Sequence, residues 1–412
     1  MASTFHSFED LCGVLENRSY DRPPAIVCNA HITGLGVARS LDAQGVPVIA
    51  LDRTPDGVAP YSDAVDVAGA IRYPLDDEDG FRDDMETLVD HLGADPVAFP
   101  CMDEWALALA RSTPDGVRLP FAEFETVDGV LDKSALYRRA IDVGVSIPET
   151  YWLEETDPEV AAEELGFPLV VKPALKRRFE EQFGTNLVVA ETPEEYHSVL
   201  TEASRADLSL LAQEFVPKEQ GDLYTLTSYV PADGTERAIT MVGNRLAVYP
   251  PSVGTTCLVE TADVPAVETN GLEILEASGY HGISEAEFLY DDRREEYLLI
   301  DVNTRPWKWI DLPIQAGADL PAVAYADTIG ESFDANPEIT DKRWVYLRDY
   351  LALLSAHPVP DRLDEDDWRA IVTGDVENHD ELTTAVYRPS DPGPTMRLIE
   401  TEFSDREYYC AC

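Results

Sequence analysis

Two neighbouring segments carry oxygen-bearing side chains at alternate positions, a spacing that could gather them at one point. The segments are HGISEAEFLYD and EYLLIDVNTRPW, at residues 281–291 and 296–307. Both alternate like β-strands, and the polar residues between them predict a hairpin turn. Centring that turn on Arg294 places Glu287 opposite Asp301. The same register places Glu285 opposite Asn303 on the same face, because strand side chains repeat with a period of two.

Three acids and an amide at the centre of otherwise apolar strands would repel one another unless something neutralised them. A divalent cation resolves this repulsion, and oxygen ligands in this number suit Mg²⁺ held jointly by protein and nucleotide phosphates. The alternative is a solvated polar face on a half-exposed hairpin. For Glu285 both interpretations stay open.

The same two segments resemble a known family. LLIDVNTRP resembles the acidic-X-Asn-X-Arg segment that closes the nucleotide site of ATP-grasp enzymes, and AEFLYD is similar to its partner strand. The resemblance implies that Glu287, Asp301 and Asn303 bind the metal, which is Mg²⁺ or, alternatively, Mn²⁺. It also implies that Arg305 is a catalytic residue near the transferring phosphate or the substrate carboxylate. There it would stabilise charge that develops on an acyl phosphate.

Two of the six lysines in the chain fall in further segments of this family. LDKSALYRRA resembles the Asp-Lys pair that opens the ATP-grasp domain, which makes Lys133 a phosphate contact. FPLVVKPA resembles the strand whose lysine reaches the α- and β-phosphates, which gives Lys172 a binding and catalytic role. A compact ammonium suits a site beside phosphate. The alternative, two surface lysines placed by chance, is weaker for Lys172 because its flanks are apolar.

The segment LAQEFVPKEQGD resembles the hinge that binds adenine. The resemblance implies that the backbone of four residues contacts the base edge and that Asp222 holds the ribose hydroxyls. The four residues are Gln213, Glu214, Phe215 and Val216. Alternatively, Glu214 and Asp222 are two more acids of an acidic protein.

One segment departs from the family. Many relatives have a glycine-rich loop after the second lysine, which folds over the phosphates. Here the stretch ALKRRFEEQFGTN holds one glycine, Gly184, and the cluster Lys176, Arg177 and Arg178. These basic side chains could replace backbone amides as phosphate or substrate clamps. A solvated loop is the equal alternative.

The elements that must position these residues begin with a predicted α/β domain. The first 130 residues alternate apolar strands with helical stretches, which indicates a parallel, Rossmann-like sheet. The strands are AIVCNA, VPVIALD and PVAFPCMD, at 25–30, 46–52 and 96–103. GLG after the first strand is a fragment of a dinucleotide fingerprint, so an NAD-dependent oxidoreductase is one alternative. The third glycine is missing, and a tight turn before a helix is the simpler interpretation.

After residue 130 the pattern changes to α+β. By resemblance we expect a Rossmann-like pre-ATP-grasp domain at 1–130 and an ATP-grasp domain at 131–330, with a lid at about 150–212. The remainder, 331–412, is expected to be a small C-terminal extension that contains the helical segment WVYLRDYLALLSA. Its last residues include Cys410 and Cys412, for which a frayed tail is the default interpretation.

Charge narrows the classes of partner. The chain has 79 Asp and Glu against 31 Lys and Arg, a formal net charge of −48, spread along its whole length. Such a surface is favoured by a salt-rich cytoplasm, because concentrated salt screens the repulsion. No basic stripe exists to bind nucleic acid, and no long apolar run exists to span a membrane. The N-terminus lacks the regions of a signal peptide, so we expect a cytoplasmic protein of undetermined oligomeric state.

The resemblance extends over roughly residues 20–330 and fits the carboxylate–amine ligase branch best, which includes D-aspartate ligase-like proteins. GLGVARSL, PCMDE with Asp103 and Glu104, and DPGPT look like that branch. NRLAVYPPSVGTT, with Arg245 and Gly254, is a candidate substrate loop. The expected activity joins a small-molecule carboxylate to an amine with ATP and Mg²⁺. The alternatives are an ATP-grasp carboxylase or phosphotransferase, and a nucleotide-binding protein that has lost turnover.

Overall fold

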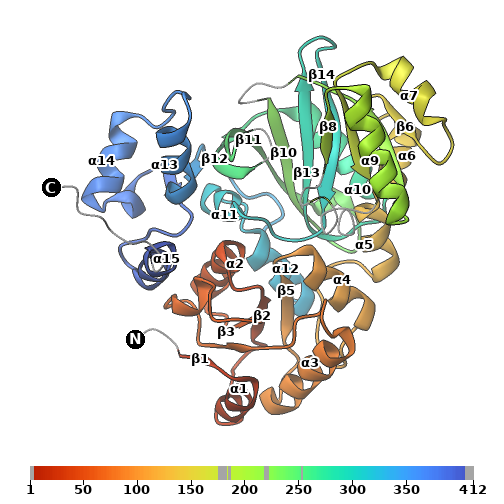
Figure 1. The fold of residues 1–412 in the computed structure, drawn as a ribbon. Helices are drawn as coiled ribbons and strands as arrows, with labels where there is room; N and C mark the ends of the chain where they lie inside the picture. Colours follow the sequence, from red (N-terminus) through yellow and green to blue (C-terminus); the bar gives the residue numbers. More distant parts are fainter. Residues whose placement is uncertain (1–3, 175–182, 184–186, 218–221, 252–253, 404–412) are drawn as a thin grey trace.

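The computed structural model describes residues 4–174, 183, 187–217, 222–251 and 254–403 (Figure 1). Three β-sheets organise this part of the chain. In Figure 1 the N-terminal sheet lies at the bottom, the central sheet and the lid lie above it, and the C-terminal extension lies to one side. No helix among the described residues is long and apolar enough to span a membrane.

The N-terminal sheet has five parallel strands in the order β1-β4-β3-β2-β5. The strands are β1 (Phe5–His6), β2 (Ala25–Cys28), β3 (Val48–Asp52), β4 (Val67–Ala70) and β5 (Val97–Pro100). The helices are α1 (Phe8–Leu15), α2 (Ile32–Ala43), α3 (Glu78–Leu92) and α4 (Asp103–Ser112), with the 3₁₀ turn η1 (Ala59–Tyr61). Because helices cover both faces, the strands are apolar throughout rather than alternating. The predicted Rossmann-like sheet is therefore confirmed.

The two glycines of GLG lie inside α2, not in a turn before it. A Cβ on Gly34 would lie 2.4 Å from the backbone oxygen of Asn29, and one on Gly36 would lie 2.8 Å from Ile310 Cγ2. These glycines therefore allow close packing, which corrects the predicted tight turn. At the end of β3, the buried Asp52 accepts a hydrogen bond from Ala30 N at 2.8 Å, so this carboxylate has a structural partner.

The lid sheet is antiparallel, in the order β6-β9-β7-β8. Its strands are β6 (Thr150–Trp152), β7 (Leu169–Pro173), β8 (Val188–Ala190) and β9 (Leu210–Glu214), and α7 (Pro158–Leu165) and α9 (Pro193–Arg205) pack on it. α9 begins with residues typical of a helix start: the Thr192 side chain accepts from Glu195 N, and Pro193 occupies the first helical position.

The central sheet has seven strands in the order β14-β13-β10-β11-β12-β15-β16. The first five are β10 (Leu223–Val230), β11 (Ile239–Tyr249), β12 (Thr255–Ala262), β13 (Gly282–Asp291) and β14 (Glu296–Asn303). The accompanying helices are α5 (Phe124–Leu131), α6 (Lys133–Val143), α10 (Pro265–Ala277), α11 (Asp311–Ala316) and α12 (Leu320–Ile329), with the 3₁₀ turn η2 (Thr235–Arg237). One apolar cluster runs from Trp105 of the N-terminal domain to Phe288 of this sheet, so the two sheets share a core.

The C-terminal extension completes the central sheet, which the sequence pattern does not predict. It supplies the edge strands β15 (Arg343–Val345) and β16 (Leu382–Thr384). It also holds α13 (Leu347–Ala356), α14 (Glu365–Thr373), η3 (Val376–Asn378) and α15 (Gly393–Phe403). The segment predicted as one helix from Trp344 is therefore a strand followed by a helix, and the predicted domain boundaries stay predictions.

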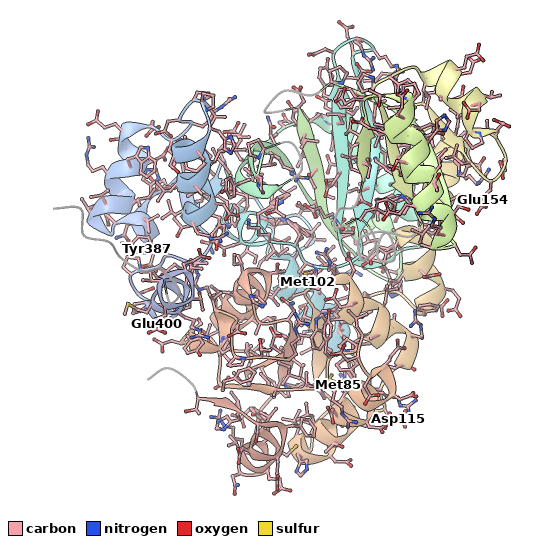
Figure 2. The ribbon with its side chains drawn as sticks, viewed as in Figure 1. Met85, Met102, Asp115, Glu154, Tyr387 and Glu400 are labelled. Carbon is pink, nitrogen blue, oxygen red and sulfur yellow. The ribbon has the colours of Figure 1, made fainter. Side chains whose placement is uncertain are left out.

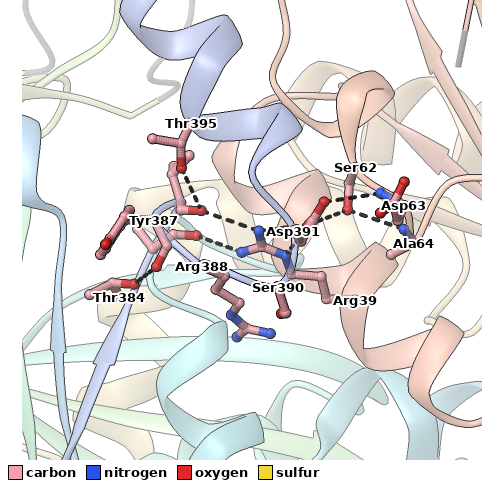
Figure 3. Close-up of polar contacts among 12 residues, drawn as sticks. Arg39, Ser62, Asp63, Ala64, Thr384, Tyr387, Arg388, Ser390, Asp391 and Thr395 are labelled. Atoms are coloured by element: carbon pink, nitrogen blue, oxygen red, sulfur yellow. Dashed lines mark hydrogen bonds and ion pairs between the residues drawn. The ribbon is translucent and has the colours of Figure 1, made fainter. Parts of the chain in front are cut away.

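A buried ion pair fastens the extension to the N-terminal domain (Figure 3). Arg39 of α2 donates from Nε and Nη2 to Asp391 Oδ2 at 3.0 and 2.8 Å. Ser62 Oγ and Asp63 N donate to the same carboxylate at 2.6 and 3.1 Å. Both charged side chains are largely buried, at 6% and 13% exposure. A second pair joins Arg388 to Asp311 of α11 at 2.7 Å.

Candidate active site

The hairpin β13–β14 brings the predicted carboxylates and amide together. Glu287 pairs with Asp301 and Glu285 pairs with Asn303, as the sequence predicts. The register then shifts by one residue between Glu287 and the next position of β13. The outer pairs are Phe288 with Leu299, Leu289 with Leu298, Tyr290 with Tyr297 and Asp291 with Glu296. The turn is therefore centred between residues 293 and 294, and a bulge at Ile300 corrects the predicted symmetry about Arg294.

Basic side chains from remote segments neutralise these acids. Lys133 Nζ, in the first turn of α6, lies 2.5 Å from Asp301 Oδ1. Arg245 Nη1, on β11, lies 2.5 Å from Glu287 Oε2. Burial alone would lower the pKa of Lys133, but Asp301 outweighs it and raises this pKa, so the ammonium stays charged. Both carboxylates thus have a compensating cation.

Glu285 lies deeper than the other two acids and is 4% exposed. Asn303 Nδ2 donates to Glu285 Oε2 at 3.0 Å and to Glu287 Oε1 at 3.3 Å. Burial, together with the negative charge of Glu287, raises the pKa of Glu285 to about 8. The amide therefore bridges the two glutamates, and Glu285 belongs to the buried array rather than to a solvated face.

The second predicted lysine lies beside the first. Lys172 is 7% exposed on β7, and its Nζ donates to Tyr137 Oη at 3.3 Å. Tyr137 in turn donates to the backbone oxygen of Ile300 at 2.9 Å. Lys133 N donates to Ala174 O at 2.9 Å, which joins the start of α6 to the end of β7. Hydrogen bonds through Tyr137 and Ala174 therefore link the two lysines and β14, and no motif in the sequence predicts the part played by Tyr137.

Arg305 follows β14 and reaches the N-terminal domain. Its Nε lies 2.5 Å from Asp103 Oδ1 at the start of α4, and its Nη1 donates to Pro306 O at 2.9 Å. Burial would lower the pKa of Arg305, but Asp103 and Glu285 raise it. Asp103 lies in the PCMDE segment, whose sequence alone assigns it no role. The useful sequence signal was its position just after a parallel strand, where open α/β sheets place functional residues.

The donor set fits a hard cation. Glu287 and Asp301 face each other across the hairpin, and the Asn303 amide lies beside them. Carboxylate and amide oxygens are the ligands that Mg²⁺ prefers when phosphates complete its shell. Within the described ranges no group of three or more His, Cys, Asp or Glu is arranged to hold a metal by itself.

Comparisons with known proteins identify the fold. No family model matches the chain. N5-Carboxyaminoimidazole synthetase from Staphylococcus aureus superposes with a TM-score of 0.62 at 14% identity, over 82% of this chain and 86% of that one. The biotin carboxylase domain of 2-oxoglutarate carboxylase from Hydrogenobacter thermophilus, solved with MgADP, ADP and bicarbonate, gives a TM-score of 0.62 at 14% identity, over 79% of this chain and 74% of that one. The chain has the ATP-grasp fold.

A curated relative is also similar in sequence. D-aspartate ligase from Enterococcus faecium is 23% identical over 202 residues, which cover 45% of this chain and 47% of the relative. The chain therefore matches about half the length of that relative. Within the ATP-grasp fold, the hairpin with Glu287, Asp301 and Asn303 lies in the central sheet, and the lid strand β7 carries Lys172.

The predicted adenine hinge lies at the end of β9. Gln213 and Val216 are buried, Glu214 is partly buried, and Phe215 is 37% exposed. Gln213 Nε2 donates to Thr150 Oγ1 at 2.8 Å. The Asp222 backbone oxygen, just before β10, accepts from Tyr290 N at 2.8 Å. The roles of these residues in binding a nucleotide stay predictions.

Glu214 has a second set of partners. Its carboxylate lies 2.5 Å from Arg294 Nη1 and 3.1 Å from Arg293 Nη2, in the β13–β14 turn. Burial would raise the pKa of Glu214, but the hydrogen bond from Arg294 outweighs it and lowers this pKa. Glu214 therefore ties the lid to the hairpin. The loop cluster Lys176, Arg177, Arg178 and Gly184 lies outside the described residues.

Proposed function

We propose that this protein is an ATP-dependent ligase that activates a carboxylate as an acyl phosphate and joins it to an amine. The observation that carries the proposal is the convergence of Glu287, Asp301 and Asn303 on one hairpin face, beside Lys133. The ATP-grasp fold and the similarity to a D-aspartate ligase support it.

In this proposal Glu287, Asp301 and Asn303 hold Mg²⁺, and Lys133 and Lys172 contact the phosphates of ATP. The metal would neutralise phosphate charge when bound. The two lysines supply positive charge from positions that are nearly buried, where it is screened little by salt. The backbone of residues 213–216 would hold adenine, and Asp222 the ribose.

The reaction then needs positioning rather than a nucleophilic side chain. A substrate carboxylate oxygen bonds to the γ-phosphorus of ATP as the bond to the β-phosphate oxygen breaks, which releases ADP. The amine nitrogen then bonds to the acyl carbon, phosphate leaves, and the amine loses a proton to solvent. Arg305 would face the charge on the acyl phosphate, held by Asp103 on one side.

A carboxylase is the second candidate, because the 2-oxoglutarate carboxylase domain that shares this fold is solved with bicarbonate. A screen for ADP release decides between the candidates. Pooled carboxylates with pooled amines, and ¹⁴C-bicarbonate with the same pooled amines as carboxyl acceptors, are tested with MgATP in about molar KCl. Release that needs both an organic carboxylate and an amine supports the ligase, whereas release that needs bicarbonate, with label retained in an N-carboxylated product at alkaline pH, supports the carboxylase.

The variant Asp301→Asn tests the proposed metal site. Loss of the carboxylate should reduce ADP release at least about 100-fold, the usual order for removing a preorganised charge at the reacting phosphate. The control is Glu296→Gln, an exposed acid at the outer end of the same strand. Undiminished ADP release from Asp301→Asn would refute the site, and no release from the unaltered protein with any substrate would leave only a nucleotide-binding role.

We also propose that the acidic composition is an adaptation to concentrated salt, a role supported by the net charge of −48.

A further inference from the structure

Arg305 follows the central-sheet strand β14 and is paired with an acid of the N-terminal domain. Asp103 Oδ1, at the start of α4, lies 2.5 Å from its Nε. Arg305 Nη1 donates to Pro306 O at 2.9 Å. The Arg305 side chain is only 12% exposed. Its orientation is therefore determined by groups around it and not by solvent.

The Asp103 carboxylate comes from a rigid part of the N-terminal domain. It is the first residue of α4, whose Trp105 is fully buried, and it follows β5 by three residues. Strands β3 and β4 lie on one side of β2 and β5 lies on the other, so the strand order reverses between β2 and β5. Crevices at such a reversal are where open α/β sheets bind ligands. Met102, just before Asp103, lies where this domain faces the central sheet (Figure 2).

Neighbouring groups fix Asp103 and Arg305 further. The adjacent Glu104 accepts from Tyr73 Oη at 2.8 Å, which anchors the first turn of α4. In the hairpin that precedes Arg305, Asn303 Nδ2 donates to Glu285 Oε2 at 3.0 Å. The pair therefore joins two preorganised surfaces, a condition for holding a reacting group within a fraction of an ångström.

We propose that Asp103 is a positioning residue for Arg305, and that the N-terminal domain contributes to phosphoryl transfer through this ion pair. The proposal rests on the function proposed above, in which Arg305 faces the acyl phosphate. Asp103 holds the Nε edge of the guanidinium, which leaves the guanidinium in one orientation before the substrate arrives. Pre-orientation of this kind removes a cost that would otherwise fall on the transition state.

The test compares a ground-state ligand with a transition-state mimic, since the substrate is not needed for either. MgADP alone reports nucleotide binding, and MgADP with aluminium fluoride reports stabilisation of a transferring phosphoryl group. Calorimetry should show that Asp103→Asn binds MgADP about as well as the unaltered protein. It should bind the fluoroaluminate complex roughly 10- to 100-fold more weakly, as expected for a misplaced catalytic group.

A double-mutant cycle separates positioning from a direct role. Arg305→Lys should show a similar loss, and the double variant Asp103→Asn/Arg305→Lys should lose no more than either single variant. The matched control is Glu78→Gln on α3. It removes a surface ion pair to Arg111, which lies on α4 like Asp103, and it does not contact Arg305. Additive losses, or full fluoroaluminate binding by Asp103→Asn, would overturn the proposal.

A second readout does not depend on turnover. In protein labelled with ¹⁵N-arginine, the Arg305 Nε–H should give a protected resonance that is lost in Asp103→Asn and kept in Glu78→Gln. An unchanged resonance in Asp103→Asn overturns the positioning role by itself. If the unaltered protein neither releases ADP nor binds fluoroaluminate, the function proposed above fails instead, and the two failures are thereby distinguished.

Discussion

The ion pair between Arg39 and Asp391 makes a sharp prediction about the C-terminal extension. Among the described residues, Asp391→Ala would leave a guanidinium that is 6% exposed with two carbonyl acceptors, Ala385 O at 3.4 Å and Val386 O at 3.2 Å. Burial lowers the pKa of Arg39, and the positive charge of the nearby Arg388 lowers this pKa further, so Arg388 adds repulsion. Breaking a buried pair by removing one partner costs about 3–5 kcal/mol. We expect the free energy of unfolding to fall by this amount.

The assay is equilibrium urea unfolding in about molar KCl, followed by tryptophan fluorescence. The matched control is Glu365→Ala, which removes an ion pair whose two side chains are 59% and 91% exposed, on α14 of the same extension. Exposed pairs contribute roughly 0–1 kcal/mol. A loss in Asp391→Ala no larger than in the control would refute the reasoning. The apolar double variant Arg39→Met/Asp391→Leu should recover most of the loss, because it leaves no buried charge.

The same carboxyl predicts a dependence on pH. Burial would raise the pKa of Asp391, but hydrogen bonds from Ser62 and Arg39 outweigh it and lower this pKa from its ordinary value of 3.8. A carboxyl whose folded-state pKa is lowered stabilises the fold above the unfolded-state pKa, and this stabilisation is lost as pH falls through the folded-state value. The stability difference between the unaltered protein and Asp391→Ala should therefore be constant near neutral pH and shrink below about pH 4.

Three further predictions follow from single features. Gly34→Ala should lower the free energy of unfolding in urea by roughly 2–4 kcal/mol, because its Cβ would lie 2.4 Å from the Asn29 backbone oxygen. Gly13→Ala in α1 is the control: its Cβ meets nothing within 4 Å, so it should raise the free energy of unfolding by about 0.5–1 kcal/mol. Lys133→Met should weaken MgATP binding at least tenfold by calorimetry, roughly 1.4 kcal/mol, and equal affinity would contradict its phosphate role. The melting temperature should rise steadily between about 0.1 and 2 M KCl as repulsion is screened, and a flat profile would refute the proposed salt adaptation.

The pairing of Glu287 with Asp301 could be predicted from the sequence, whereas the pairing nearer the turn could not. Alternation with a period of two determines that Glu287 faces Asp301, because both lie on the polar face of otherwise apolar strands. The extra residue at Ile300 follows two further apolar residues, so no change of polarity marks it. A bulge of this kind is decided by the neighbouring strands and by the groups that bind there, such as Tyr137 on the Ile300 oxygen.

Contacts between remote segments could not be predicted from the sequence for a different reason. Lys133 and Asp301 are 168 residues apart, and their meeting depends on how α6 packs on the central sheet. The strands β15 and β16 are three residues each, too short to show alternation. The edge of β12 offers backbone partners to β15, and β16 pairs in turn with β15. Motif order could indicate which residues belong to one site, whereas the ion pairs among them required the packed chain.

The placement of three basic residues suits the phosphate site that we propose for this acidic chain. Only 31 basic residues are available against 79 acids. Lys133, Arg245 and Arg305 are nevertheless 6%, 11% and 12% exposed, each within 2.5 Å of an acid of the candidate site or of its facing domain. In concentrated salt an exposed cation loses most of its attraction within a few ångströms, whereas a buried one keeps it. A chain that must bind phosphate in such a solvent therefore gains most from cations held beneath the surface, as these three are.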